Sequence, residues 1–392
     1  MNDNDAARRE RALASLGLAE TMGSARLNRI TDLVTQALGL PISTVTVLDG
    51  DRASFPASTG TDGEDMAVSD TFCEVTQALG ATVVVEDARL DDRFSEKRAV
   101  QEDGIRFYVG QPLRDVHGTV VASLCMADME TRTLRDEELA LFLELASWAE
   151  QELVGAAEMR LAGEAQSALL PPGPVSHGVW RIEGNCVPAS AIGGDFYDYD
   201  ISTHVASVRL GDVMGKGTAA ALIGAGVRAC LRGTNDAINA GVDLGVTVTR
   251  AARVMEPDLE RTSAFSTLFE AAVDLEDGTL RYVDAGSGLA LLVRSEGEVV
   301  HLLGQDRPLG ILPGDHWTEH RDEVRPGDRL VVFSDGLLDL VGDSPGWVDR
   351  VSALVRKYDD PADLIAEVSE QSRLLSTIDD VTIVVLSCAT GE

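Results

Sequence analysis

Apolar residues in the first third of the chain recur with two different periods. A helical period of three to four residues runs through about residues 8–37 and ends near Gly39 and Pro41. Alternating, β-branched stretches then predict strands at residues 43–49, 81–87, 105–114 and 118–128, and a short helix is expected at 70–79. This mixture of strands and short helices predicts an α+β domain that closes near residue 135.

A long helical stretch follows at residues 136–170, and no proline interrupts it before Pro171. Six apolar residues lie along it in steps of three and four: Leu139, Phe142, Ala146, Ala149, Leu153 and Ala156. Such spacing is typical of a coiled-coil seam, which predicts a dimerising linker helix and a homodimer. The alternative is an amphipathic helix packed on its own domain, and since Arg160 and Gly163 break the repeat, the pattern leaves both interpretations open.

A Pro- and Gly-rich break at residues 171–174 precedes a second, longer β-rich domain. The patterns predict strands at 179–188, 199–211, 266–274, 279–285, 289–294, 329–334 and 381–387, and helices at 217–231, 243–255, 347–357 and 361–374. Strands with only a few long helices between them favour a layered α+β sandwich over a doubly wound sheet. The expected organisation is an N-terminal helix or tail at 1–23, a domain at 24–135, a helical linker and possible coiled coil at 136–170, and a domain at 171–392.

The formal charge of −32 argues against a nucleic-acid partner, because binding a polyanion draws on clustered Lys and Arg. No run approaches the roughly 20 apolar residues that a membrane span needs, and the polar N-terminus lacks a signal-peptide core. We therefore expect a cytoplasmic protein that contacts neither nucleic acid nor membrane.

The five cysteines are widely spaced and never form a C-x-x-C pair, so the sequence predicts neither a structural zinc site nor a disulfide scaffold. They are interpreted as buried thiols in a reducing compartment. In the first domain we assign Cys73, Tyr108 and Cys125 to the core rather than to ligand contact.

Acidic residues lie beside glycines at the ends of predicted strands in four separate motifs of the second domain. These are GGDFYD (193–198), GDVMGKG (211–217), FSDGLLD (333–339) and IDDVT (378–382). One Asp-Gly pair alone is foremost a turn signal. Four acidic motifs together indicate a site for Mg²⁺ or Mn²⁺, since carboxylates are hard oxygen ligands and paired cations about 3.5–4 Å apart can activate a water against a phosphoester.

These motifs, in this order with FSTLF, RYVDAGSG and RPLG between them, resemble the type 2C metal-dependent protein phosphatases (PPM) over about residues 165–388. More narrowly, they resemble the bacterial branch associated with sporulation and stress-response sigma-factor control. The resemblance implies an αββα sandwich with a binuclear Mn²⁺ or Mg²⁺ centre.

The resemblance also implies a role for each matched residue. Asp212 would bridge both metals, and the carbonyl of Val213 would be a further ligand. Asp335 and Asp379 would hold one metal, and Asp195 would hold the other, directly or through water, and help to orient the nucleophile. Three glycines would shape the approach of the phosphate: Gly193, Gly194 and Gly211.

One departure concerns the acid step. Many animal and plant relatives have a histidine just after the bridging aspartate, whereas Met214 and Gly215 follow Val213 here. Protonation of the leaving oxygen would then fall to water or to another group. Three further acids of the motifs, Asp198, Asp339 and Asp380, are interpreted as partners of loop backbone rather than as ligands.

The first domain resembles GAF domains over about residues 24–155, on the stretches DTFCEVTQ, VEDARLDDRF, IRFYVGQPLR and GTVVASLCMAD. GAF domains are sensory or dimerising modules, and nothing in the sequence selects a ligand. The two resemblances together imply a GAF-controlled protein serine/threonine phosphatase whose substrate is a phosphorylated anti-sigma-factor antagonist with a STAS fold. The alternatives are a non-catalytic phosphoprotein-binding regulator and a small-molecule or nucleotide phosphatase.

Overall fold

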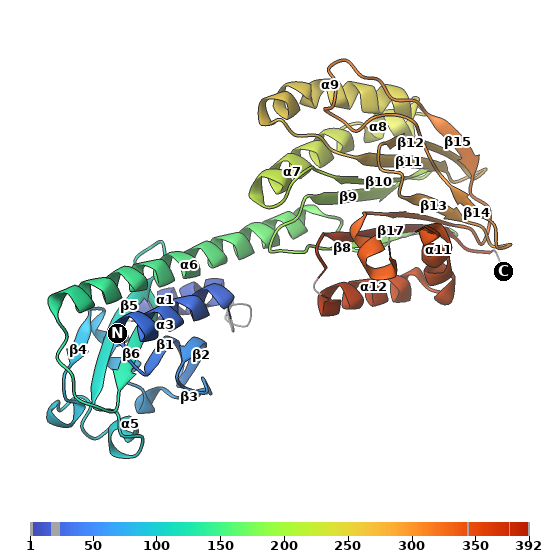
Figure 1. The fold of residues 1–392 in the computed structure, drawn as a ribbon. Coiled ribbons are helices and arrows are strands. Elements are labelled where there is room, and N and C mark those ends of the chain that lie inside the picture. The colour runs from blue at the N-terminus through green and yellow to red at the C-terminus, as the bar shows by residue number, and fades with distance from the viewer. Residues whose placement is uncertain (1–2, 17–23, 343–344, 376, 391–392) are drawn as a thin grey trace. The chain divides into compact units, whose positions relative to one another are not determined.

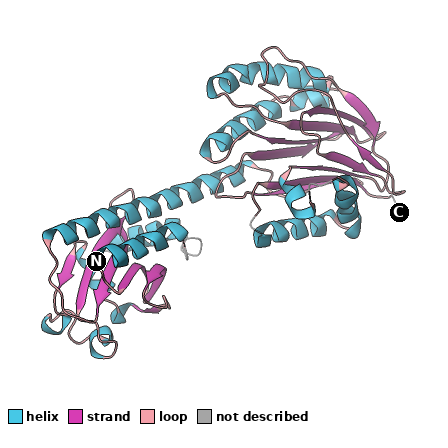
Figure 2. Ribbon diagram, in the orientation of Figure 1, coloured by secondary structure: helices cyan, strands magenta, loops and turns pink. Residues whose placement is uncertain are grey.

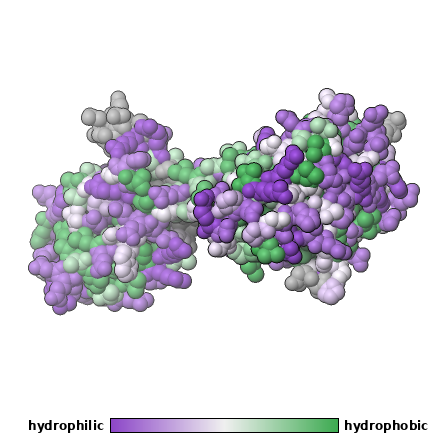
Figure 3. All heavy atoms as spheres, turned by 90° about the horizontal axis from the view of Figure 1, so that it is seen from above, coloured by the Kyte–Doolittle hydropathy of each residue, from purple (hydrophilic) through white to green (hydrophobic). Residues whose placement is uncertain are grey.

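The computed structural model of the chain describes residues 3–16, 24–342, 345–375 and 377–390 (Figure 1). The chain divides into two compact units, Met1–Leu161 and Ala162–Glu392, here termed the N-terminal and C-terminal units. The division falls inside helix α6 (Asp136–Leu169), so the last turns of this helix belong to the C-terminal unit. Hydrophilic side chains cover most of the face in Figure 3, as the acidic composition leads one to expect. None of the described helices is long and apolar enough to cross a membrane.

An antiparallel six-stranded sheet forms the centre of the N-terminal unit. Its strand order is β3 (Met66–Ala67), β2 (Arg52–Thr59), β1 (Ile42–Asp49), β6 (Val120–Asp128), β5 (Phe107–Arg114) and β4 (Val83–Val85). Four of these strands match the predicted ones. Strand β2 was not predicted, because its sequence RASFPAST contains a proline and few β-branched residues.

Two apolar cores lie on opposite faces of this sheet. Helices α1 (Asp3–Leu16), α3 (Ala25–Leu38) and α6 bury one face, where Leu124 and Met126 of β6 point. The shorter helices α4 (Cys73–Leu79) and α5 (Arg98–Gln101), with the 3-10 turns η1 (Val68–Asp70) and η2 (Ala88–Leu90), lie toward the other, where Cys125 points. The described residues of the predicted N-terminal helix belong to α1 and α3, and residues 17–23 lie outside the described part.

Helix α6 spans nearly the whole predicted linker, but its apolar stripe packs against its own unit and does not form the predicted coiled-coil seam. Phe142, Ala146, Ala149 and Leu153 are all buried in the core of the N-terminal unit. This burial corrects the coiled-coil interpretation for the stretch and favours the alternative, a helix packed on its own domain. The outward face instead carries Leu141 and Trp148, which are 37% and 48% exposed.

Two antiparallel sheets packed face to face form the C-terminal unit (Figure 2). The first has the order β15 (His320–Glu323), β12 (Thr279–Ala285), β11 (Leu268–Asp274), β10 (Val205–Asp212) and β9 (Asp195–Ile201). The second has the order β14 (Val299–His301), β13 (Ala290–Val293), β16 (Arg329–Phe333), β17 (Val381–Cys388), β8 (Trp180–Val187) and β7 (Val175–His177). A core shared by both sheets fills the space between them.

Helices cover the outer face of each sheet. The first sheet carries α7 (Thr218–Arg232), α8 (Asn235–Asn239) and α9 (Leu244–Thr262), and the second carries α10 (Gly336–Val341), α11 (Trp347–Lys357) and α12 (Pro361–Leu375). Each helical layer has its own apolar core against its sheet. The result is the expected αββα sandwich, and with the N-terminal unit it confirms the α+β fold class.

The hairpin β9–β10 differs from the sequence prediction, which placed one strand at 199–211. The strand in fact turns back on itself between Ile201 and Val205. Here the Ser202 hydroxyl accepts hydrogen bonds from the backbone N–H groups of His204 and Val205 at 3.3 and 2.9 Å. A serine side chain therefore makes the turn without Gly or Pro, the residues by which turns are usually recognised in sequence.

Candidate metal centre

The β9–β10 hairpin brings two of the predicted ligands together. Asp195 begins β9, Asp212 ends β10, and the two are directly paired across the strands, which places their Cβ atoms about 4.5–5.5 Å apart. Both side chains lie on the face shared with Tyr197 and Leu210, which pack into the core between the sheets, because alternate residues of a strand share a face. The pair therefore sits where the first sheet meets the second.

The second sheet supplies the other two acids. Asp335 follows β16 and Asp379 precedes β17, and these strands are antiparallel neighbours. The backbone N–H of Ser334 donates to the Thr382 carbonyl at 3.0 Å, which holds the two strand ends side by side. The Thr382 hydroxyl in turn donates to the Asp195 carboxylate at 2.5 Å and so connects the two sheets at the site.

Asp380 fixes the loop that leads into Asp195. Its carboxylate accepts hydrogen bonds from the backbone N–H groups of Ala189, Gly194 and Asp195 at 2.9, 2.7 and 3.3 Å. A carboxylate used in this way holds backbone, as the sequence interpretation expected of it. Asp198 likewise has a partner other than a metal, since it forms an ion pair with Arg228 at 3.1 Å.

The acids of the site repel one another. Burial, followed by the charges of Asp335, Asp379 and Asp380, raises the pKa of Asp212 to about 7. Burial and the charge of Asp212 raise the pKa of Asp195 well above its ordinary value, and burial with the charge of Asp379 raises that of Asp335. Burial and neighbouring negative charges favour the protonated, neutral form of a carboxyl group. The raised pKa values therefore indicate that the protein places too little positive charge near these carboxylates to keep all of them ionised.

Two of the acids are engaged by protein groups in this structure. Lys216 lies 3.1 Å from the Asp379 carboxylate and also donates to the Ile378 carbonyl at 2.7 Å, while Asp195 accepts from Thr382. Among the described residues, no three His, Cys, Asp or Glu side chains are gathered closely enough to hold a metal as they stand. The carboxylates nevertheless fit hard divalent cations, because each raises the pKa of a neighbour and a cation would relieve that repulsion.

The three predicted glycines are confined by protein atoms. A Cβ at Gly193 would lie 2.2 Å from the Asp380 carboxylate, and one at Gly194 would lie 2.8 Å from the Val213 carbonyl and 3.1 Å from Asp212. A Cβ at Gly211 would instead meet the ring of Phe196 at 2.5 Å. Gly193 and Gly194 therefore border the acids, whereas Gly211 is required for packing behind them.

Sequence reasoning missed Gln166, near the end of α6. Its side-chain amide donates to the Gly193 carbonyl at 2.8 Å, and its oxygen accepts from the Gly193 N–H at 3.1 Å. No local signal could have identified this contact, because it joins residues 27 positions apart in different elements. Thr382 was also missed as a partner of Asp195, although it lies within the quoted IDDVT motif.

Two protein families match the chain in succession. The GAF domain family matches residues 24–153, and the family described as stage II sporulation protein E (SpoIIE) matches residues 203–389. The chain joins a GAF domain to a SpoIIE-type phosphatase domain. Asp212, Asp335 and Asp379 fall inside the range matched by the phosphatase family, and Asp195 lies just before it.

Several curated proteins are similar to parts of this GAF–SpoIIE chain. Cyclic di-GMP phosphodiesterase PA2567 of Pseudomonas aeruginosa is 34% identical over 140 residues, covering 35% of the chain and 24% of that relative. Phosphoserine phosphatase RsbU of Bacillus subtilis is 24% identical over 228 residues, covering 57% of the chain and 62% of RsbU. The chain thus spans less than two thirds of the length of either relative.

Solved structures are also similar to parts of the chain. The SiaA-PP2C domain of Pseudomonas aeruginosa has a TM-score of 0.48 and 22% identity, covering 61% of this chain and 98% of that one. The RsbU and RsbW domains of Rv1364c from Mycobacterium tuberculosis have a TM-score of 0.46 and 23% identity, covering 57% and 62%.

Proposed function

We propose that the C-terminal unit is a metal-dependent protein serine/threonine phosphatase. The observation that carries this proposal is the convergence of Asp195 and Asp212 from one sheet with Asp335 and Asp379 from the other, with raised pKa values at Asp195, Asp212 and Asp335. Of these acids Asp195 is buried and Asp212 is partly buried, and neither has an ion-pair partner among the described residues. Acids placed in this way are costly unless they serve a purpose, and binding divalent cations is the purpose this geometry fits.

The ligand roles we propose are those that the resemblance to the PPM phosphatases implies. Asp212 would bridge two Mn²⁺ or Mg²⁺ ions, with Asp335 and Asp379 on one side and Asp195 on the other, and the Val213 carbonyl as a further ligand. The bound ions would lower the pKa of a water molecule and polarise the phosphoester. Thr382 would orient the Asp195 carboxylate, and Asp380 would hold the 189–195 loop in place.

The protonation of the leaving oxygen is assigned to water. Met214, which stands where many relatives have a histidine, is 47% exposed and cannot donate a proton. An exposed position beside the acids gives water access to the leaving group. This assignment fits phosphoserine and phosphothreonine, whose ordinary alkoxide leaving groups need a proton.

The substrate we propose is a phosphorylated anti-sigma-factor antagonist with a STAS fold. Support comes from the SpoIIE family match and from the similarity to RsbU, which is named a phosphoserine phosphatase. The GAF domain would control the reaction in response to a ligand that the sequence does not select. We place the homodimer contact on the outward face of α6, where Leu141 and Trp148 are one heptad apart and exposed.

The test compares two aspartates of one motif in the full-length chain. With Mn²⁺ and p-nitrophenyl phosphate, Asp335→Asn is expected to lower kcat/KM by roughly 10³-fold. Asp339→Asn, four residues later and exposed, is the matched control and should stay within about threefold. Equal rates in Asp335→Asn and the unmodified chain would refute the site.

Candidate phosphorylated STAS proteins then distinguish the alternatives. Release of phosphate from them, dependent on Mn²⁺ and faster than from nucleotides, is the expected result. Tight binding without release would indicate a non-catalytic regulator. Faster turnover of nucleotides would indicate a small-molecule phosphatase.

A further inference from the structure

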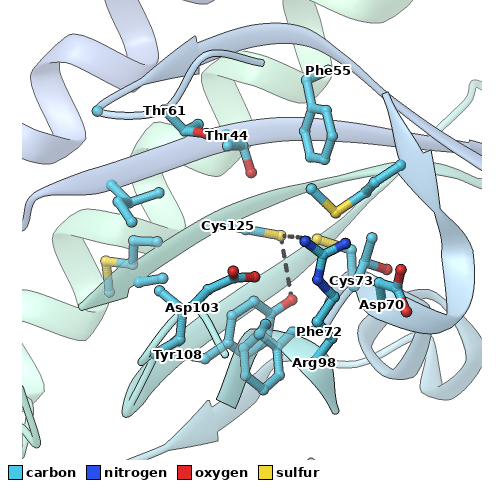
Figure 4. A pocket seen from close by; sticks show the side chains of 18 of the residues that line it. Thr44, Phe55, Thr61, Asp70, Phe72, Cys73, Arg98, Asp103, Tyr108 and Cys125 are labelled. Carbon is cyan, nitrogen blue, oxygen red and sulfur yellow. Dashed lines mark hydrogen bonds between the residues drawn. The ribbon is translucent and has the colours of Figure 1, made fainter. Parts of the chain in front are cut away.

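Two cysteines of the GAF domain lie in contact although they are 52 residues apart. The Sγ atoms of Cys73, on α4, and Cys125, on β6, are 3.0 Å apart (Figure 4). Both are free thiols in this structure. A disulfide bond has an S–S length of about 2.0 Å, so the two sulfurs lie only about 1 Å farther apart than in a disulfide.

The surroundings of this pair are more polar than a thiol in an apolar core requires. Cys73 donates to the Thr46 hydroxyl at 3.2 Å, and Cys125 contacts the hydroxyl oxygens of Tyr108 and Ser123 at 3.3 and 3.4 Å. Tyr108 is itself hydrogen-bonded to Thr76 at 2.7 Å. The hydroxyl groups can therefore donate to a sulfur that has lost its proton.

The hydrogen bonds separate the two thiols in acidity. The contact with Cys125 lowers the pKa of Cys73 to about 7, whereas burial raises the pKa of Cys125 well above its ordinary value. The thiolate is the reactive form of cysteine, so Cys73 is the thiol that reacts first with an oxidant, and Cys125 is the resolving thiol.

The pair is reached through a cavity of about 520 Å³. Cys73 and Cys125 are only 5% and 4% exposed, but both line this cavity. Its lining includes several carboxylates and one cation: Asp62, Glu64, Asp65, Asp70, Asp103 and Arg98. An excess of acids disfavours an anionic oxidant, so the geometry favours a small neutral one.

We propose that Cys73 and Cys125 form a dithiol site that a hydroperoxide oxidises to a disulfide. The Cys73 thiolate attacks one peroxide oxygen, the O–O bond breaks, and the other oxygen leaves as water or an alcohol after taking up a proton. Cys73 is then a sulfenic acid. Cys125 attacks its sulfur, the S–S bond forms, and the hydroxyl group leaves as water with the Cys125 proton.

The disulfide would have a defined structural effect. It would covalently join α4 to the central strand β6, across the cavity wall. A two-electron reduction by an external dithiol returns both thiols, so the modification is reversible. This site is separate from the acids of the phosphatase domain and does not depend on their proposed role.

The remaining three cysteines provide an internal comparison. Cys186, Cys230 and Cys388 all lie in the C-terminal unit, and burial raises the pKa of each of them. The lowered pKa of Cys73 and the second sulfur 3.0 Å from it both favour oxidation of the GAF pair. This oxidation should be roughly tenfold faster than that of Cys230, whose pKa burial raises.

The experiment treats the reduced full-length chain with hydrogen peroxide and counts free thiols by alkylation and intact mass. The expected result is the rapid loss of two of the five thiols, a peptide linking Cys73 to Cys125, and recovery of both thiols with dithiothreitol. In Cys125→Ser, Cys73 should stop at a sulfenic acid that dimedone traps. In Cys73→Ser the rapid phase should be lost, and in Cys230→Ser it should be unchanged.

Three results would overturn the proposal. One is rapid oxidation that leaves Cys73 and Cys125 unlinked in the unmodified chain. The second is a rapid phase that persists in Cys73→Ser, and the third is oxidation of Cys230 at the same rate as the pair. Since the first and third are read from the unmodified chain, they hold even if a serine variant fails to fold.

Discussion

Two residues of strand β10, Arg209 and Asp212, both face acidic side chains on neighbouring strands, but one of them is a cation and the other is an acid. Arg209 is paired across the sheet with Glu270 on β11 and Asp198 on β9. Asp212 is paired across the sheet with Asp195 on β9. The same strands therefore hold one place where buried acids face a cation and another where a buried acid faces an acid.

In the Arg209 neighbourhood each buried acid has a cation within ion-pair distance. The Arg209 guanidinium lies 3.1 Å from Glu270, and both side chains are buried. Asp198 forms ion pairs with Arg228 at 3.1 Å and with Arg232 at 3.4 Å. No described residue forms an ion pair with Asp195 or Asp212, and burial together with the charge of a neighbouring acid raises the pKa of each. Burial also raises the pKa of Glu270, but there the charge of Arg209 acts in the opposite direction. The contrast separates acids that the protein pairs with its own cations from acids for which we propose cations from outside.

The largest effect is expected at Asp212. Asp212→Asn preserves the size of the side chain but removes the charge that both metals would share, and activity with Mn²⁺ should fall by roughly 10³-fold. The measurement is the steady-state rate of p-nitrophenyl phosphate hydrolysis in Mn²⁺. Asp363→Asn, an exposed acid on α12, is the control. Retention of more than a tenth of the activity would contradict a bridging role.

Breaking the Arg209 neighbourhood should cost stability instead. Arg209→Met leaves Glu270 buried without its partner, and the free energy of unfolding should fall by about 3–5 kcal/mol. Urea denaturation provides the measurement. The double variant Arg209→Met/Glu270→Leu should recover most of the loss, because two apolar side chains leave no buried charge. A double variant no more stable than the single one would show that packing, not charge, is at stake.

The pH dependence of stability should differ between metal-free and metal-bound protein. The Asp212 carboxyl has a pKa of about 7 in the folded state and an ordinary value of 3.8. Between these values the folded state holds a proton that the unfolded state has released, so the stability of the metal-free chain falls as pH rises. Mn²⁺ binds the deprotonated form.

The rise in Tm on adding Mn²⁺ should therefore be larger at pH 8 than at pH 5, by several degrees. Thermal denaturation in Mn²⁺ and in EDTA measures this difference. Asp212→Asn is the matched control, because it should melt at a higher temperature than the unmodified chain in EDTA at pH 8 and gain little from Mn²⁺. An equal Mn²⁺ effect at both pH values would contradict the assignment.

The smallest effect is expected at Gln166. Its side chain forms hydrogen bonds with the carbonyl and the N–H of Gly193, in the loop that leads into Asp195. Gln166→Ala should raise the Mn²⁺ concentration for half-maximal activity by about fivefold, the equivalent of one hydrogen bond. Gln151→Ala, on an exposed turn of the same helix, should leave it unchanged. Similar values in the two variants would show that α6 does not support the site.

Much of the fold could be predicted from periodicity. Helices α11 and α12 and strands β12, β16 and β17 lie within one residue of their predicted ranges, because their apolar faces repeat clearly. The β9–β10 turn and strand β2 could not be predicted, since a serine side chain makes the turn and a proline interrupts the strand pattern.

The sequence by itself determined the fold class, the succession of two families and the acids that stand beside glycines at strand ends. Only the tertiary structure decided which acid lies beside which charge, because Glu270 and Asp195 are both buried, but Glu270 faces Arg209 across the strand and Asp195 faces Asp212. It also decided that the α6 stripe packs on its own unit and that Cys73 meets Cys125. Periodicity records which side of an element is buried, whereas a charge or a thiol takes its chemistry from neighbours distant in sequence.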